Sequence, residues 1–147
     1  MLIQRIREKR RARQLTRLSP GKLVWTGDSF CVKGISWDVH WQTDRILAII
    51  IRDYLRFFIR ETPAIGPCVI PDDLKDPLGW FSASDKTCEA LTQTWKNKVN
   101  AAADEFDTLR LLIERRDGDD PAPEEEIKGQ TRKAFSGLAK IYGDLNW

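Results

Sequence analysis

The sequence has few of the residues from which metal sites, disulfide frameworks and membrane spans are built. Its 147 residues include three cysteines and one histidine. Cys31, Cys68 and Cys88 are odd in number and have no C-x-x-C spacing, so neither a disulfide framework nor a zinc site is indicated, and reduced thiols in a cytoplasm fit best. No apolar run reaches the length of about eighteen residues that a membrane span needs. The sequence therefore predicts a soluble protein with no metal site, no cofactor and no membrane contact.

Catalytic motifs are missing as well. The chain has no P-loop, no G-x-G-x-x-G, no H-E-x-x-H and no pattern that pairs a nucleophile with a base. His40 is expected on the core side of a helix, while Asp38, Asp44 and Asp53 are spread around that helix rather than paired for acid–base or metal chemistry. The sequence therefore predicts a binding protein that is not an enzyme.

Positive charge is concentrated at the start of the chain. The net charge is +2, yet residues 1–17 alone carry +6, which leaves −4 for the remainder. The basic side chains in this stretch are Arg5, Arg7, Lys9, Arg10, Arg11, Arg13 and Arg17. Clustered arginines bind a phosphate backbone by releasing its counterions, so this arm is a candidate nucleic-acid contact, and the alternative is a solvated or partner-binding tail. We assign residues 1–20 to a basic arm and 21–147 to one helical domain.

Turn residues and hydrophobic periodicity predict an all-α fold with a small added β-hairpin. The stretch "LVWTGDSFCVK" reads as two short strands around Gly27-Asp28, which gives a hairpin over 23–33. Three main helices follow, two of them long and antiparallel. The first is expected to begin with a cap at Ser36 and to end before Pro63; the second is capped by Ser82 or Ser84 and runs to about Arg116. The third follows Pro123, where three glutamates suit the positive end of a helix dipole.

The second helix has the strongest periodic signal. Its apolar residues recur every three or four positions, which predicts one narrow seam that faces the core. The seam consists of Cys88, Leu91, Trp95, Val99, Ala102, Phe106, Leu109 and Ile113. The third helix places apolar residues on one face in the same way: Ile127, Ala134, Leu138, Ile141, Tyr142 and Leu145.

The first helix is apolar almost all the way round, yet it carries a stripe of arginines on one side. The stripe consists of Arg45, Arg52, Arg56 and Arg60, and the core face is expected at Leu47, Ile50, Ile51, Tyr54 and Phe58. One interpretation is a solvated face. The other is that Arg45, Arg52 and Arg56 converge on phosphate or carboxylate, because guanidinium groups bind such groups bidentately. An anion held between the protomers of a homo-oligomer, with Trp41 beside it, would cover the apolar residues among these arginines.

The helix that contains Trp41 resembles one in a known family. Its pattern Trp41, Asp44, Leu47-Ala48, Ile51 and Leu55 is similar to that of an uncharacterised group of small helical proteins encoded by tailed bacteriophages, which open a helix with W-x-x-D-x-x-L-A-x-x-I. Three further pieces match in order: the acidic, proline-containing loop "VIPDDLKDP", a helix led by Trp95, and "GLAKIYGDLNW", which resembles an L-x-x-L-W-like C-terminal tail. The resemblance covers roughly residues 37–147. The longer acidic insertion of that group is missing here, and the arm is not part of its pattern.

The resemblance implies a phage or prophage accessory protein that acts in the host cytoplasm, and it transfers no catalytic residues. By analogy with phage proteins that counter host defences, the leading hypothesis is a non-enzymatic protein that sequesters an anionic small molecule, such as a nucleotide immune signal, at Arg45, Arg52, Arg56 and Trp41. The alternative hypothesis is a protein that binds nucleic acid or a host protein through the arm.

Overall fold

Three helices form most of this computed structural model, which describes residues 22–27, 30–33, 43–62, 65–76, 78–79, 82–116 and 118–145. They are α2 (Thr43–Glu61), α4 (Asp85–Arg116) and α5 (Glu124–Tyr142). The predicted all-α class with three main helices is therefore confirmed. The predicted cap at Ser36, His40 and Trp41 lie outside the described residues, as does the whole arm.

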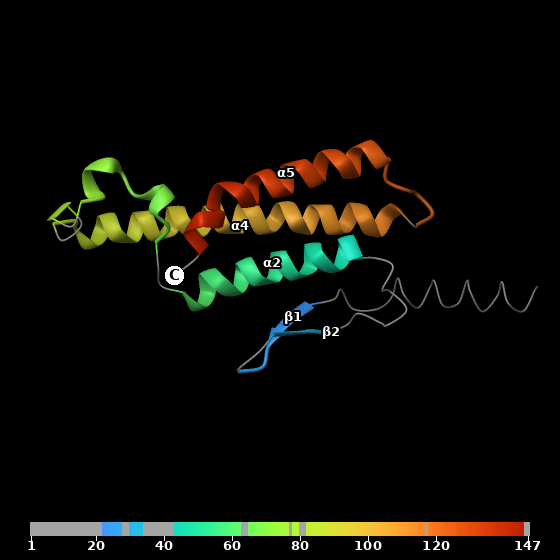
Figure 1. Ribbon diagram of the computed structural model, residues 1–147, viewed down its shortest axis with the longest axis horizontal. Helices are drawn as coiled ribbons and strands as arrows, with labels where there is room; N and C mark the ends of the chain where they lie inside the picture. Colours follow the sequence, from blue (N-terminus) through green and yellow to red (C-terminus); the bar gives the residue numbers. More distant parts are fainter. Residues whose placement is uncertain are drawn as a thin grey trace, which may run out of the picture.

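Helix α4 is the centre of the fold. It has 32 residues, whereas α2 and α5 have 19 each, and it lies between them (Figure 1). Ion pairs join Arg45 near the start of α2 to Glu114 near the end of α4, and Arg56 further along α2 to Asp104 further back on α4. These pairs can form only if α2 and α4 run in opposite directions.

Local chemistry explains where α4 begins and ends. The Ser84 hydroxyl accepts a hydrogen bond from the backbone N–H of Thr87 at 3.2 Å, which satisfies one of the free donors of the first turn. Asp85 lies in the first turn, and Arg115 and Arg116 lie in the last, so both ends carry the charge that the helix dipole favours. Of the two predicted caps, the structure uses Ser84.

The predicted seam of α4 forms the core from Trp95 to Ile113, whereas its first two residues, Cys88 and Leu91, are only partly buried. Trp95, Val99, Phe106 and Ile113 are each no more than 2% exposed. Two clusters of buried residues lie along this seam, one around Trp95 and Val99 and one around Phe106 and Ile113. Ile51 of α2 and Leu138 of α5 pack against both clusters. Side chains from both flanking helices therefore link the two clusters into one continuous core.

A pair of short strands lies beside α2, on the side away from α4 (Figure 1). Strands β1 (Lys22–Trp25) and β2 (Phe30–Lys33) are antiparallel, with Leu23 opposite Val32. Gly27, between the strands, has a φ of 105°, a conformation that side-chain-bearing residues rarely adopt. The turn predicted at Gly27-Asp28 lies partly outside the described residues, because Asp28 is not among them.

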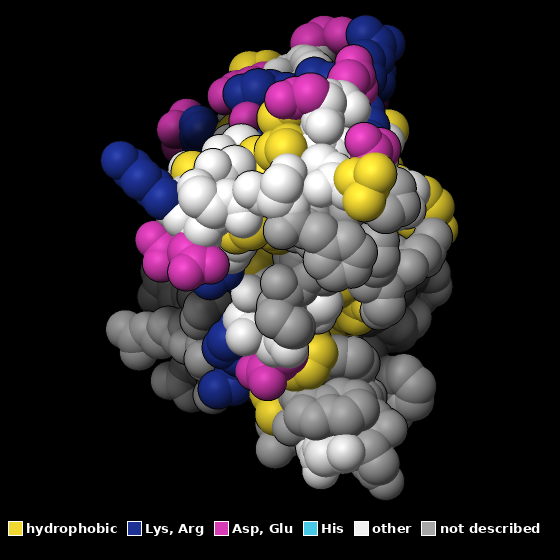
Figure 2. All heavy atoms as spheres, turned by 90° about the vertical axis from the view of Figure 1, so that its left-hand side faces the viewer, with side chains coloured by type: hydrophobic (Ala, Val, Ile, Leu, Met, Phe, Trp, Pro, Cys, Tyr) yellow, Lys and Arg dark blue, Asp and Glu magenta, His cyan; other side chains and the backbone are white. Residues whose placement is uncertain are grey.

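The connection between α2 and α4 packs over the first half of α4. It contains two single turns, η2 (Pro67–Val69) and η3 (Asp72–Leu74). Gly66 lies so close to the ring of Trp95 that an added Cβ would come within 2.4 Å of it, so a side chain there would displace the tryptophan. The backbone N–H of Cys68 donates to Asp144 of η4 (Gly143–Leu145) at 2.8 Å and ties this connection to the end of α5. Figure 2 looks onto this end of the molecule, where acidic, basic and hydrophobic side chains alternate.

None of the helices in the described part of the chain combines the length and the hydropathy needed to cross a bilayer.

Candidate functional site: the arginine face of helix α2

The face of α2 that packs on α4 is not the face that the apolar pattern predicted. Leu47 is 48% exposed and Tyr54 is 39% exposed, so the prediction that both belong to the core face was wrong. The buried positions of α2 are instead Arg45, Ala48, Ile49, Arg52, Leu55 and Phe58. Helix α2 turns two of its arginines inward, because α4 presents carboxylates to them.

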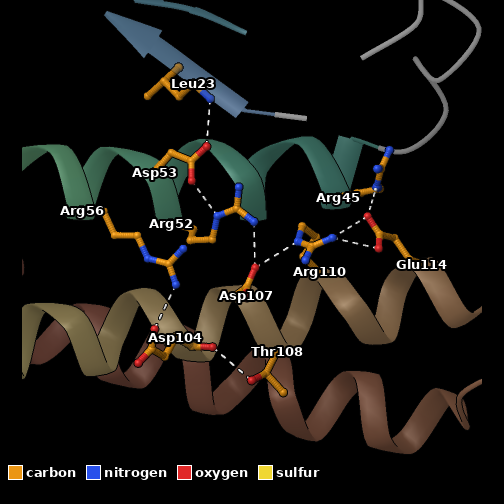
Figure 3. A network of polar contacts seen from close by, with 10 residues as sticks. All are labelled: Leu23, Arg45, Arg52, Asp53, Arg56, Asp104, Asp107, Thr108, Arg110 and Glu114. Carbon is orange, nitrogen blue, oxygen red and sulfur yellow. Dashed lines mark hydrogen bonds and ion pairs between the residues drawn. The ribbon is translucent and has the colours of Figure 1, made fainter. Parts of the chain in front are cut away.

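Arginines of α2 and α4 form a continuous network of ion pairs with the carboxylates of α4 (Figure 3). Arg45 Nε donates to Glu114 Oε1 at 2.8 Å, and Arg110 Nη1 donates to both oxygens of the same carboxylate at 2.8 Å. Arg52 Nη1 donates to Asp107 Oδ1 at 2.7 Å, and Arg110 Nε reaches the same oxygen at 3.0 Å. Arg110 therefore links the two interhelical pairs into one network.

The network also reaches the strand pair. Arg52 Nε donates to Asp53 Oδ1 at 2.6 Å, and the second oxygen of Asp53 accepts the backbone N–H of Leu23 at 2.9 Å. A single carboxylate thus connects β1, α2 and, through Arg52, α4. Because Leu23 offers its backbone rather than a side chain, this contact fixes the position of the strand itself.

Burial decreases along the stripe from the network to the end of α2. Arg45 is 8% exposed and Arg52 is 7% exposed. The side chain of Arg56 is 43% exposed and pairs with Asp104 at 3.0 Å, and Arg60, 67% exposed, pairs with its neighbour Glu61 at 2.6 Å. The four arginines that the sequence grouped together therefore occupy two environments, a buried network and a solvated end.

Charge pairing fixes the ionisation of the network. Burial lowers the pKa of Arg52, but hydrogen bonds to Asp53 and Asp107 outweigh that effect, so the pKa of Arg52 lies above its ordinary value. Burial raises the pKa of Asp107, but hydrogen bonds from Arg52 and Arg110 outweigh it, so the pKa of Asp107 lies below its ordinary value. Both groups are ionised at neutral pH.

These arginines already have anionic partners. Among the described residues, every buried side-chain nitrogen and oxygen has a hydrogen-bond partner. A phosphate placed at Arg45 or Arg52 would have to displace Glu114 or Asp107 and leave that carboxylate in a partly buried site without its partner. The geometry therefore favours a structural role, in which Arg45, Arg52 and Arg56 each pair with a different carboxylate of α4.

The spacing of charges along the chain contains the signal that was missed. Arg45, Arg52 and Arg56 are separated by seven and four residues, and Glu114, Asp107 and Asp104 are separated, in the reverse direction, by seven and three. Asp44 and Arg116 continue the same antiparallel register with the charges exchanged, and Arg116 Nη1 lies 2.9 Å from Asp44 Oδ2. Opposite charges at matching helical spacings on two segments indicate that the segments pair with each other.

Other predicted site residues cannot be placed relative to this network. Trp41 and the arm residues Arg5, Arg7, Lys9, Arg10, Arg11 and Arg13 lie outside the described residues. Within the described residues, no group of three or more His, Cys, Asp or Glu side chains is arranged to hold a metal ion.

Comparisons with family models, curated proteins and solved structures gave no match to this chain. The resemblance to small helical phage proteins is not tested by these comparisons and stays a prediction.

Proposed function

We propose that this chain is a non-enzymatic accessory protein that binds nucleic acid through its Arg-rich arm. The observation that supports the proposal is how positive charge is divided. The arginine stripe of α2 is neutralised by carboxylates of the same chain, whereas residues 1–17 carry +6 with Glu8 as their only acid. The surplus positive charge therefore belongs to the arm.

The remainder of the chain strengthens this division. Outside residues 1–17 the net charge is −4, so the helical body repels a polyanion while the arm attracts it. Such a distribution favours an orientation in which nucleic acid contacts the arm and the body points away. Arginine is suited to the contact because its guanidinium group remains charged and pairs bidentately with phosphate oxygens.

Sequestration of a nucleotide at Arg45, Arg52, Arg56 and Trp41 is a weaker proposal. Arg45 and Arg52 are each more than nine-tenths buried and hydrogen-bonded to carboxylates. A nucleotide phosphate would compete with carboxylates that are held in place by folding, so its affinity would be low. A phage origin and action in the host cytoplasm remain proposals that rest on the resemblance alone.

The salt dependence of binding tests the proposal. If about six arm cations contact phosphates, affinity for duplex DNA should fall about 1,000-fold between 50 and 200 mM salt. Replacing Arg7, Arg10, Arg11 and Arg13 with Gln should flatten the slope of log K against log salt by about 3 to 4, since each lost phosphate contact removes about 0.9. Fluorescence anisotropy with a labelled duplex measures both quantities.

A matched control separates the arm from net charge. The control variant replaces four exposed basic residues of the helices with Gln and so removes the same formal charge as the arm variant. These residues are Arg60, Arg115, Arg132 and Lys140. This control variant should show the same slope of log K against log salt concentration as the parent protein. Equal losses in both variants would show that affinity follows net charge, and no binding at low salt would refute the proposal.

A further inference from the structure

A second surface of the molecule has the properties of a contact between protein chains. Among the described residues, six large hydrophobic side chains are exposed, and four of them belong to α2 and α5. They are Leu47 at 48% exposed, Tyr54 at 39%, Phe135 at 46% and Tyr142 at 66%. The other two, Leu78 and Leu111, lie on the connection before α4 and on α4 itself.

These four side chains lie on the two helices that flank α4, next to residues that pack on the core. Ile51 is one helical turn from Leu47 and from Tyr54, and Leu138 is one turn from Phe135 and from Tyr142. Ile51 and Leu138 pack against the same two buried clusters, so both rows border the same core. We call Leu47, Ile51, Tyr54, Phe135, Leu138 and Tyr142 the apolar face.

Ring contacts hold two aromatic side chains of this face against the core. Phe135 meets Phe106 edge to face, with ring centroids 5.2 Å apart, and the Tyr54 ring lies 6.5 Å from that of Phe58. Both rings are anchored on one side and open to solvent on the other. A surface of this kind is rigid before it binds, so less conformational entropy is lost on association.

The arginine network explains why the α2 part of this surface is exposed. Helix α2 turns Arg45 and Arg52 toward α4, and its remaining apolar residues then exceed what the core can cover. Contiguous apolar surface of this kind marks an interaction site on a soluble protein. It carries no charged residue, so the chemistry that it recognises is an apolar protein surface rather than a nucleic acid.

We propose that the apolar face binds the apolar face of a second copy of this chain. An aromatic side chain has an area of about 150–250 Å², and we take Leu47 as similar in size. Multiplying this area by the exposed fractions of the four side chains gives a solvent-exposed apolar area of about 400 Å². A stable dimer buries about 800 Å² per protomer, of which somewhat more than half is apolar. The apolar face supplies most of that apolar area.

The apolar face is suited to a two-fold contact. A two-fold axis parallel to the helices sets α2 of one protomer against α5 of the other, so each apolar row meets an apolar row of the partner.

A dimer would also bring two basic arms into one particle. Two linked arms bind a polyanion with an avidity above that of either arm alone. The dimer itself does not depend on nucleic-acid binding, because the apolar face and the arm are different surfaces.

The oligomeric state of the full-length protein tests this inference. Light scattering and sedimentation over a micromolar to millimolar series should give twice the chain mass of 17.0 kDa. The double variant Leu47→Lys with Tyr142→Lys should sediment as a monomer with an unchanged helical circular dichroism spectrum. The control Leu111→Lys should remain dimeric, because Leu111 is also 48% exposed but lies outside the apolar face.

Each remaining outcome decides against the inference. A parent protein that is monomeric throughout the series overturns it, as does a double variant that stays dimeric or a control that dissociates. If the double variant loses helical content, Tyr142→Lys alone replaces it, since that side chain is 66% exposed and ends the helix. This single change should raise the dimer dissociation constant about tenfold, and an unchanged constant overturns the inference.

Discussion

The two sides of α4 make their contacts by different chemistry. On the side of α2, Arg52 and Arg110 pair with Asp107, and this network of directional hydrogen bonds lies beside apolar packing by Ala48, Leu55 and Phe58. On the side of α5, Phe106 meets Phe135 edge to face and packs with Ala134. Polar contacts lie at the margin of this interface, where Gln130 Nε2 donates to the Glu105 backbone carbonyl at 2.9 Å. One helix therefore supports an interface with α2 that adds a buried ionic network to apolar packing, and an interface with α5 whose buried part is apolar.

The difference shows what each interface contributes. Apolar burial is non-directional and roughly proportional to area, so it supplies much of the free energy of folding but tolerates sliding. Ion pairs between matched positions gain little net energy after desolvation, but a shift of one helical turn would separate every pair. The apolar side of α4 is expected to set stability, and the ionic side is expected to set the register of α2.

Truncating a side chain in the apolar seam of α4 should have the largest effect on the free energy of unfolding. Phe106 is fully buried, so Phe106→Ala should lower the free energy of unfolding by about 3–5 kcal/mol through lost burial and a residual cavity. Urea unfolding followed by circular dichroism measures the change. The exposed Leu111→Ala on the same helix should cost about 0.5 kcal/mol. Equal effects of the two changes would show that the seam is not the main source of stability.

Removing ion pairs between α2 and α4 should lower the free energy of unfolding by a smaller amount. Arg52→Met keeps most of the side-chain volume but removes the hydrogen bonds to Asp53 and Asp107, so the expected loss is about 2 kcal/mol. Arg52→Lys keeps the charge but cannot reproduce two bonds from one planar group, and should lie between Arg52→Met and the parent. Denaturant melts of the three proteins give the order. A Met variant as stable as the parent would mean that the network carries no net stabilisation.

The sequence predicted the apolar side of α4 better than the ionic side, and the reason is physical. Residues such as Trp95, Val99 and Phe106 repeat at helical spacing, so their burial can be inferred from one segment alone. Arg45 and Arg52 are buried only because Glu114 and Asp107, 69 and 55 residues further along the chain, neutralise them. Hydrophobic periodicity counts arginine as polar and turned the predicted face of α2 toward Leu47 and Tyr54. Matching charge spacings contain that information only when two segments are compared.

The smallest expected effect lies at the solvated end of the same stripe. Arg56 pairs with Asp104 at 3.0 Å, but the two side chains are 43% and 69% exposed. Water already solvates both groups and salt screens their attraction, so Arg56→Gln should lower the free energy of unfolding by about 0.5 kcal/mol or less. Melts of this variant beside Arg52→Met compare two arginines on one helix face that differ mainly in burial. If the contribution follows burial, high salt should remove most of the effect at Arg56 and little of that at Arg52. Equal, salt-insensitive losses at the two positions would instead mean that the stripe acts as a single cooperative unit, with Arg56 coupled to the buried network despite its exposure.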